Sequence, residues 1–185
     1  MHTRILVSIL TTVIHPLNHT KKAQTKSRPS LNPDSFRKGL EFEKYVIGLF
    51  NKENFKLIKH REAKIMEGRL LTADLAYPDL EMIFGKYSKH PFAVECKWRK
   101  SFQEGKINLA TDFQIHSYIN FEKAYHIPVF IAIGIGGLPS SPECLFVTPL
   151  RNIENMTEVY ETDLIPYKKE IGRRLFYHPV QMKLF

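Results

Sequence analysis

The chain has 185 residues, 43% of them hydrophobic and 25% charged, with a formal net charge of +8. That length allows one domain with a hydrophobic core and is too short for two such domains. The composition is ordinary for a soluble globular protein. The two cysteines, Cys96 and Cys144, lie far apart in apolar runs, without a partner at metal-ligand spacing. We therefore expect reduced core cysteines in a cytoplasmic protein, and neither a disulfide framework nor a structural zinc site.

The N-terminal segment differs in charge from the rest of the chain. Residues 1–30 contain five basic residues and no acidic residue. We predict an arm and linker over 1–34 and a folded domain over 35–185. A basic arm suits a polyanion such as nucleic acid, and a solvated tail is the simpler alternative. The apolar run from Ile5 to Ile14 is too short to cross a bilayer, so no stable membrane span is expected. It fits a weak signal-like segment, or a short strand or helix packed on the domain.

Within the domain, hydrophobic periodicity predicts alternating helices and strands. In chain order we expect a helix over 36–51, strands over 55–61, within 70–84 and over 92–98, a polar loop over 101–109, a helix over 111–124, a buried strand over 127–135 and an edge strand over 144–147. Asp34 or Ser35 is expected to cap the first helix. The order α-β-β-β-α-β predicts an α/β fold with a mixed central sheet flanked by helices.

Two of the predicted strands carry charged residues in apolar surroundings. Glu95 and Lys97 are two residues apart, so a strand directs both side chains to one face. A hairpin would bring Asp79 beside Glu95, and Asp74 competes for that place. A metal-dependent phosphodiesterase uses such groups, because two acids hold a divalent cation and a lysine orients or deprotonates the attacking water. The alternative is a surface strand with an ordinary ion pair.

The segments Pro78-Asp79 and Glu95-Cys96-Lys97 together resemble the motif of the PD-(D/E)xK nuclease superfamily. Members of that superfamily include restriction endonucleases, RecB-type exonucleases and Holliday-junction resolvases. The resemblance implies a restriction-endonuclease-like core and a Mg²⁺ cofactor, with Mn²⁺ as an alternative. It also implies that Asp79, Glu95 and the carbonyl of Cys96 bind the metal, and that Lys97 acts in catalysis with the two acids.

Two flanking segments extend the resemblance. Gly39-Leu40-Glu41-Phe42-Glu43 resembles the Gly-x-x-Phe-Glu start of Mrr-like restriction enzymes, and Gln114-Ile115-His116-Ser117-Tyr118 is similar to the Gln-x-x-x-Tyr helix of RecB-like nucleases. By this resemblance Glu43 and Gln114 are accessory catalytic residues, and Tyr118 packs near the site or touches DNA. Each of the three also has a plain alternative as a helix residue without a catalytic role.

Basic residues near the predicted site are candidate contacts to nucleic-acid phosphates. Arg99, Lys100 and Lys106 follow the strand that carries Glu95, and Lys86 and Lys89 precede it. The alternative for each is an ordinary surface charge.

The predicted function is that of a metal-dependent DNA endonuclease, which hydrolyses phosphodiester bonds. DNA is the expected partner, and a homodimer would supply one site for each strand. No small-molecule cofactor is expected, because the glycines at 134–137 follow a strand but open no helix. Three alternatives stay open: a Holliday-junction-resolvase-like nuclease, a non-catalytic nucleic-acid-binding module of the same fold, and an interaction or membrane-associated protein that docks through its apolar N-terminus.

Overall fold

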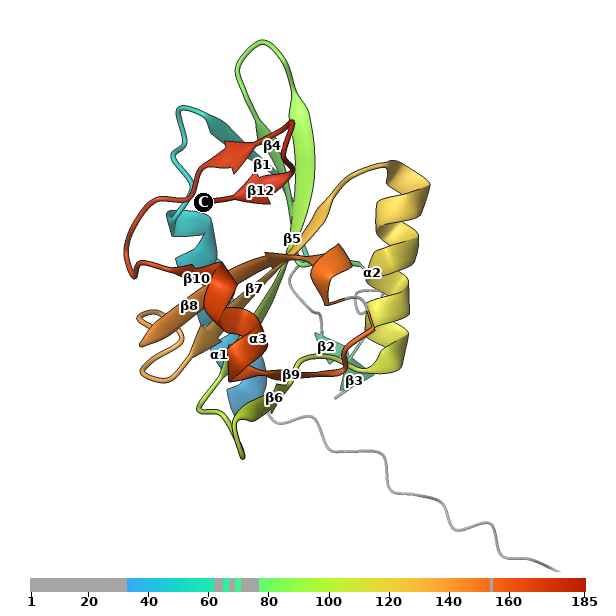
Figure 1. The fold of residues 1–185 in the computed structure, drawn as a ribbon. Helices are drawn as coiled ribbons and strands as arrows, with labels where there is room; N and C mark the ends of the chain where they lie inside the picture. Colours follow the sequence, from blue (N-terminus) through green and yellow to red (C-terminus); the bar gives the residue numbers. More distant parts are fainter. Residues whose placement is uncertain (1–32, 62–64, 67–68, 71–76, 154) are drawn as a thin grey trace, which may run out of the picture. The chain divides into compact units, whose positions relative to one another are not determined.

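The computed structural model describes residues 33–61, 65–66, 69–70, 77–153 and 155–185, which belong to one compact unit (Figure 1). Its α-helices are α1 (Pro33–Gly48), α2 (Asp112–Tyr125) and the short α3 (Glu161–Leu164), and 3₁₀ turns lie at Leu150–Asn152 and Ile165–Tyr167. The strands are β1 (Phe55–His60), β2 (Ile65–Met66), β3 (Arg69–Leu70), β4 (Leu80–Phe84), β5 (His90–Arg99), β6 (Lys106–Asn108), β7 (Val129–Ile135), β8 (Cys144–Pro149), β9 (Glu158–Tyr160), β10 (Lys168–Lys169), β11 (Tyr177–His178) and β12 (Lys183–Leu184).

Six strands form the central sheet in the order β1-β4-β5-β7-β8-β10. β5 and β7 are parallel, and the other neighbouring pairs are antiparallel. A parallel pair needs a crossover connection, which α2 supplies between β5 and β7. The predicted α/β fold with a mixed sheet is therefore confirmed. The predicted order of helix, three strands, helix and strand is that of α1, β1, β4, β5, α2 and β7.

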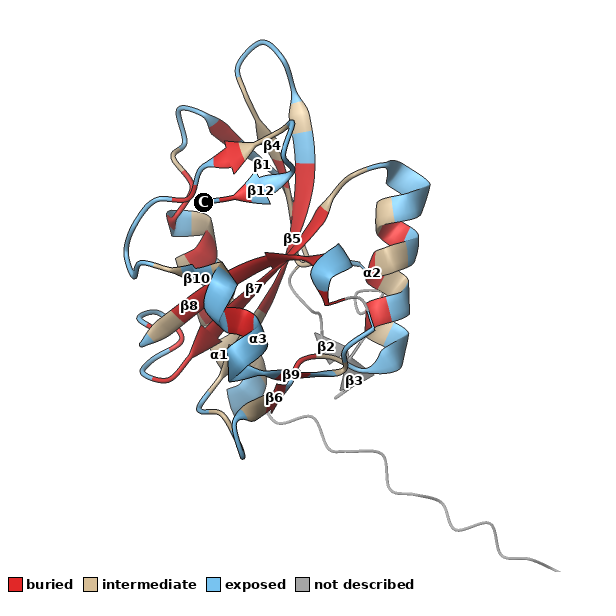
Figure 2. Cartoon of the chain, in the orientation of Figure 1, coloured by how far each residue is buried: buried red, intermediate tan, exposed pale blue. Residues whose placement is uncertain are grey.

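Alternation along β5 divides the hydrophobic core between the two faces of the sheet. Phe92, Val94 and Cys96 belong to the cluster that contains the buried residues of α1. Ala93 belongs to the cluster that contains the buried residues of α2. Figure 2 shows the buried residues running along β5 and β7 between the two helices. Because side chains alternate along a strand, Glu95 and Lys97 lie on the α2 face.

Strand β7 is buried along its whole length, as its apolar sequence predicted, because α1 and α2 cover opposite faces of the sheet. Gly134 lies in β7 beneath α1. A Cβ atom at this position would overlap the ring of Phe42. Glycine at 134 therefore lets α1, which carries Glu43, approach the sheet closely.

Three local features differ from the predictions. α1 begins at Pro33, so Asp34 and Ser35 lie in its first turn and not before it, and proline is well suited to a first helical position. The strand β8 is not at the sheet edge, because β10 pairs with it. The predicted polar loop over 101–109 contains β6, which pairs with β9.

The predicted N-terminal arm and its apolar run lie outside the described residues, except for positions 33 and 34. Among the residues that are described, no helix combines the length and the apolar character needed to cross a membrane.

Candidate active site

Three ionisable side chains meet where β4 begins beside β5. Lys97 forms an ion pair with Oε1 of Glu95 on the same face of β5. Leu80, the first residue of β4, pairs with Val94, so Asp79 comes to lie next to Glu95. Oδ2 of Asp79 accepts a hydrogen bond of 2.7 Å from the backbone N–H of Cys96. The structure thus brings together the three groups that the sequence placed in one site.

Burial gives this cluster unusual electrostatics. Burial and the neighbouring charges of Glu95 and Glu43 raise the pKa of Asp79 well above its ordinary value, although Lys97 acts in the opposite direction. Burial acts to lower the pKa of Lys97, but Glu95 and Asp79 outweigh it and the net shift is upward. The lysine therefore stays protonated, and the site carries carboxylates held close to one another.

The carboxylate of Glu95 has one engaged oxygen and one free oxygen. Oε1 accepts a hydrogen bond of 2.6 Å from the hydroxyl of Tyr118 on α2, in addition to its ion pair with Lys97. Oε2 is buried and has no hydrogen-bond partner among the described residues. Buried carboxylate oxygens are normally satisfied. A buried free oxygen marks a place where a cation or a donor from a ligand fits.

The donor set at this place suits a hard divalent cation. No three His, Cys, Asp or Glu side chains within the described ranges are arranged as a metal site. Mg²⁺ does not need three, because it is usually bound by one or two carboxylates together with water and substrate phosphates. In a strand the N–H and C=O of one residue face the same neighbour, so the carbonyl of Cys96 is directed to the side where Asp79 accepts its N–H. Asp79, Glu95 and that carbonyl are thus the groups available to a metal.

Neither a protein-family model nor a curated protein sequence matches this chain. Among solved structures the chain is similar to Hjc, a Holliday junction resolvase from the archaeal hyperthermophile Archaeoglobus fulgidus. The two share 18% sequence identity, the similarity covers 71% of this chain and 95% of that chain, and the TM-score is 0.48.

Glu43 reaches the edge of the cluster from α1. Its Oε2 lies 2.7 Å from Nε2 of His60 at the end of β1, and the two side chains are 13% and 17% exposed. Its charge contributes to the raised pKa of Asp79. The structure thus places Glu43 near the site, paired with a histidine that the sequence pattern did not single out.

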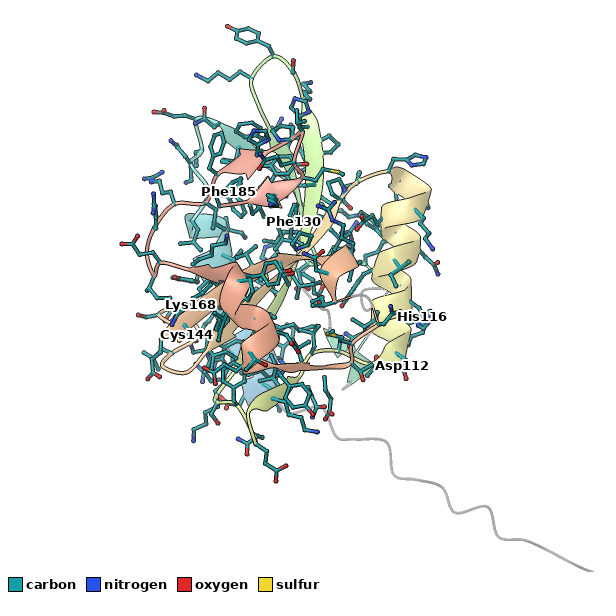
Figure 3. The ribbon with its side chains drawn as sticks, viewed as in Figure 1. Asp112, His116, Phe130, Cys144, Lys168 and Phe185 are labelled. Atoms are coloured by element: carbon teal, nitrogen blue, oxygen red, sulfur yellow. The ribbon has the colours of Figure 1, made fainter. Side chains whose placement is uncertain are left out.

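Among the described residues, the contacts of the Gln114 side chain are with Thr111 and not with the carboxylate cluster. Its side chain accepts a hydrogen bond from the backbone N–H of Thr111, and its own N–H donates to the hydroxyl of Thr111. This reciprocal pair is a capping box, which starts the helix by supplying acceptors to backbone N–H groups that have no earlier carbonyl partner. Figure 3 shows Asp112 and His116 on the outer side of α2, one turn apart. The side of α2 that faces the sheet carries Ile115 and Tyr118.

Four of the residues predicted to contact nucleic acid differ from one another in burial and in hydrogen-bond partners. Tyr118 is only 1% exposed and donates its hydroxyl to Glu95, so it packs beside the carboxylate cluster, and its contact with DNA stays a prediction. Arg99 donates to the carbonyls of Asn108 and Leu109, and Lys106 pairs with an acid on β9, Glu158. These two cations support the β6 region. Lys100 is exposed at the end of β5.

Arg61 is a further residue of the site that the sequence pattern did not reveal. Its guanidinium donates to the carbonyl of Pro78, pairs with Glu81 and lies 4.9 Å from the ring centre of Tyr77. Its backbone N–H donates to the carbonyl of Asp79. Arg61 therefore fixes the segment that carries the carboxylate. The competing residue Asp74 lies outside the described part of the chain.

Proposed function

We propose that the protein is a metal-dependent nuclease that hydrolyses phosphodiester bonds of DNA. The observation that carries this proposal is the buried, unpartnered Oε2 of Glu95 beside the carboxylate of Asp79 and the ammonium of Lys97. Purely structural ion pairs satisfy their buried oxygens, whereas a site built to receive a cation leaves an acceptor free.

Asp79, Glu95 and the carbonyl of Cys96 would hold the metal. A bound divalent cation would supply charge stabilisation at the phosphoryl oxygens and activate water for attack. The raised pKa of Lys97 keeps its ammonium charged. It therefore acts by donating hydrogen bonds that orient the attacking water or a phosphate oxygen, and not as a base. Tyr118 and Lys97 both contact Oε1 of Glu95, which leaves Oε2 available to the metal.

The test is cleavage of supercoiled plasmid and of branched DNA in Mg²⁺ or Mn²⁺. We expect the wild type to cut at least one of them. Glu95→Gln and Lys97→Met should each lower the rate by about 100-fold or more, as the loss of a group that stabilises the transition state does. Thermal unfolding of each variant checks folding, because removing one partner of a buried ion pair costs about 3–5 kcal/mol.

Glu161→Gln and Lys123→Met change an exposed acid and an exposed lysine and serve as matched controls. Both should cut as the wild type does. Equal cutting by wild type, Glu95→Gln and Lys97→Met would contradict the assignment. DNA binding without cleavage by any form would favour the non-catalytic module instead.

A further inference from the structure

A basic pocket lies at the far end of the β4–β5 hairpin from the carboxylate cluster. It has a volume of about 400 Å³, and Lys52, Lys56, Lys86 and Lys89 line it with a single acid, Glu53. All four lysines are exposed, and none forms an ion pair with a described residue. Four lysines facing one acid repel one another more than that acid offsets, and a polyanion would relieve the repulsion.

The register places part of this pocket on the same face of the sheet as the candidate active site. Lys56 on β1 pairs with Ile83 on β4, and Lys59 pairs with Glu81. Ile83 and Glu81 alternate with buried residues that face α1, so they lie on the opposite face. Glu95 lies on that face as well.

The spacing along the hairpin matches a nucleic-acid backbone. Ile83 pairs with Pro91, and Glu95 follows four residues later on β5. At the rise of a strand this is about 13 Å, or roughly four base pairs of B-DNA. β1 at the edge of the sheet and the turn at 85–89 at the far end of the hairpin are both exposed. A duplex that runs along this edge from the carboxylate cluster would reach the lysines.

We propose that Lys52, Lys56, Lys86 and Lys89, the hairpin lysines, bind the phosphate backbone of duplex DNA beside the scissile bond. The proposal rests on the proposed nuclease function for its substrate. Lysines make point-charge contacts to phosphates that carry no sequence information. Phe55 lines the pocket and is 6% exposed, whereas Tyr87 in the turn between Lys86 and Lys89 is 97% exposed. We choose a duplex as the partner because its stiffness keeps successive phosphates at a fixed spacing over the span of about 13 Å between the cluster and the lysines.

The test is the salt dependence of binding, measured in a chelator so that no cleavage occurs. Fluorescence anisotropy with a labelled duplex of about 20 base pairs gives the affinity between roughly 50 and 300 mM salt. The slope of log affinity against log salt should become less steep by about 0.9 for each phosphate contact removed. The variant with Lys52→Gln, Lys56→Gln, Lys86→Gln and Lys89→Gln should therefore lose a slope of about 3–4.

The matched control carries Lys44→Gln, Lys123→Gln, Lys168→Gln and Lys183→Gln, four exposed lysines elsewhere on the domain, with the same change in net charge. Its slope should fall by less than about 1, since only non-specific charge is lost. An unchanged slope in the hairpin variant, or equal losses in both variants, would overturn the proposal. A loss seen with single-stranded but not duplex DNA would overturn the choice of partner. Failure of the wild type to cleave DNA would contradict the proposed nuclease function but not the binding of DNA by the hairpin lysines.

Discussion

At the scale of single residues, the site gathers more carboxyl groups than its one lysine can pair with. Burial and the charges of Glu95 and Glu43 raise the pKa of Asp79 above its ordinary value of 3.8. A group whose pKa is raised on folding contributes stability at pH below its ordinary value, and that contribution is lost as the pH rises through the raised pKa. Asp79 therefore destabilises the metal-free protein increasingly as the pH rises above the ordinary pKa of the carboxyl group. A bound cation would remove this cost.

Asp79→Asn should raise the Tm of the metal-free protein at pH 8, because the amide is uncharged and its oxygen still accepts the N–H of Cys96. Each kcal/mol gained corresponds to about 2–4 °C for a domain of this size. The gain should shrink towards pH 4, because the cost of the raised pKa falls as the pH approaches the ordinary pKa of the carboxyl group. The same variant should lose the rise in Tm that Mg²⁺ gives the wild type. Scanning calorimetry at both pH values, with and without Mg²⁺, measures all of these.

Asp163→Asn, which changes an exposed acid on α3, is the control and should leave both the pH profile and the Mg²⁺ response unchanged. If Asp79→Asn lowers the Tm at pH 8 in chelator, the carboxylate is stabilising the fold and the electrostatic account of the site fails.

At the scale of elements, the capping box at the start of α2 accounts for Gln114. Thr111→Ala and Gln114→Ala each remove one half of the reciprocal bond, and each should cost about 1 kcal/mol of stability. Cleavage per folded molecule should stay near the wild-type rate in both, because Tyr118 lies one turn further along α2. Thermal melts paired with cleavage assays separate the two effects.

The two variants serve as controls for each other. A catalytic Gln114 would make Gln114→Ala lose cleavage while Thr111→Ala kept it, and that outcome would support the role predicted from the resemblance. Equal losses of stability with equal activity would leave the helix cap as the explanation.

At the scale of the whole folded unit, the approach of α1 to the sheet decides where Glu43 lies. Gly134→Ala should destabilise the protein by about 1–3 kcal/mol, because the added methyl group overlaps the ring of Phe42. Denaturant unfolding measures the change. Gly48→Ala is the control, since nothing lies within 4 Å of its added Cβ atom, and it should be as stable as the wild type or more stable by up to about 1 kcal/mol, because alanine favours a helix over glycine. A Gly134→Ala protein of wild-type stability would mean that α1 does not rest on β7 at this point.

Local sequence patterns predict much of the fold. The apolar sequence of β7 predicted a strand that other elements cover on both faces. The two-residue spacing of Glu95 and Lys97 predicted that both side chains lie on one face of β5. Both follow from backbone periodicity, which neighbouring residues determine by themselves. The turn at 85–89 was also predictable locally, because Gly85 and Ser88 are turn-forming residues between two apolar segments.

Only the tertiary structure decided which partner each polar group takes. Tyr118 donates to a residue 23 positions away, and Asp79 accepts from one 17 positions away. Such contacts depend on strand register and on how a helix sits on a sheet, and no local spacing encodes them. For that reason the sequence could name the carboxylates and the lysine but could not assign Gln114 to a helix cap, Tyr118 to the interior or Arg61 to the support of Asp79. Periodicity determines which face a side chain occupies, whereas packing between distant segments determines what it meets there.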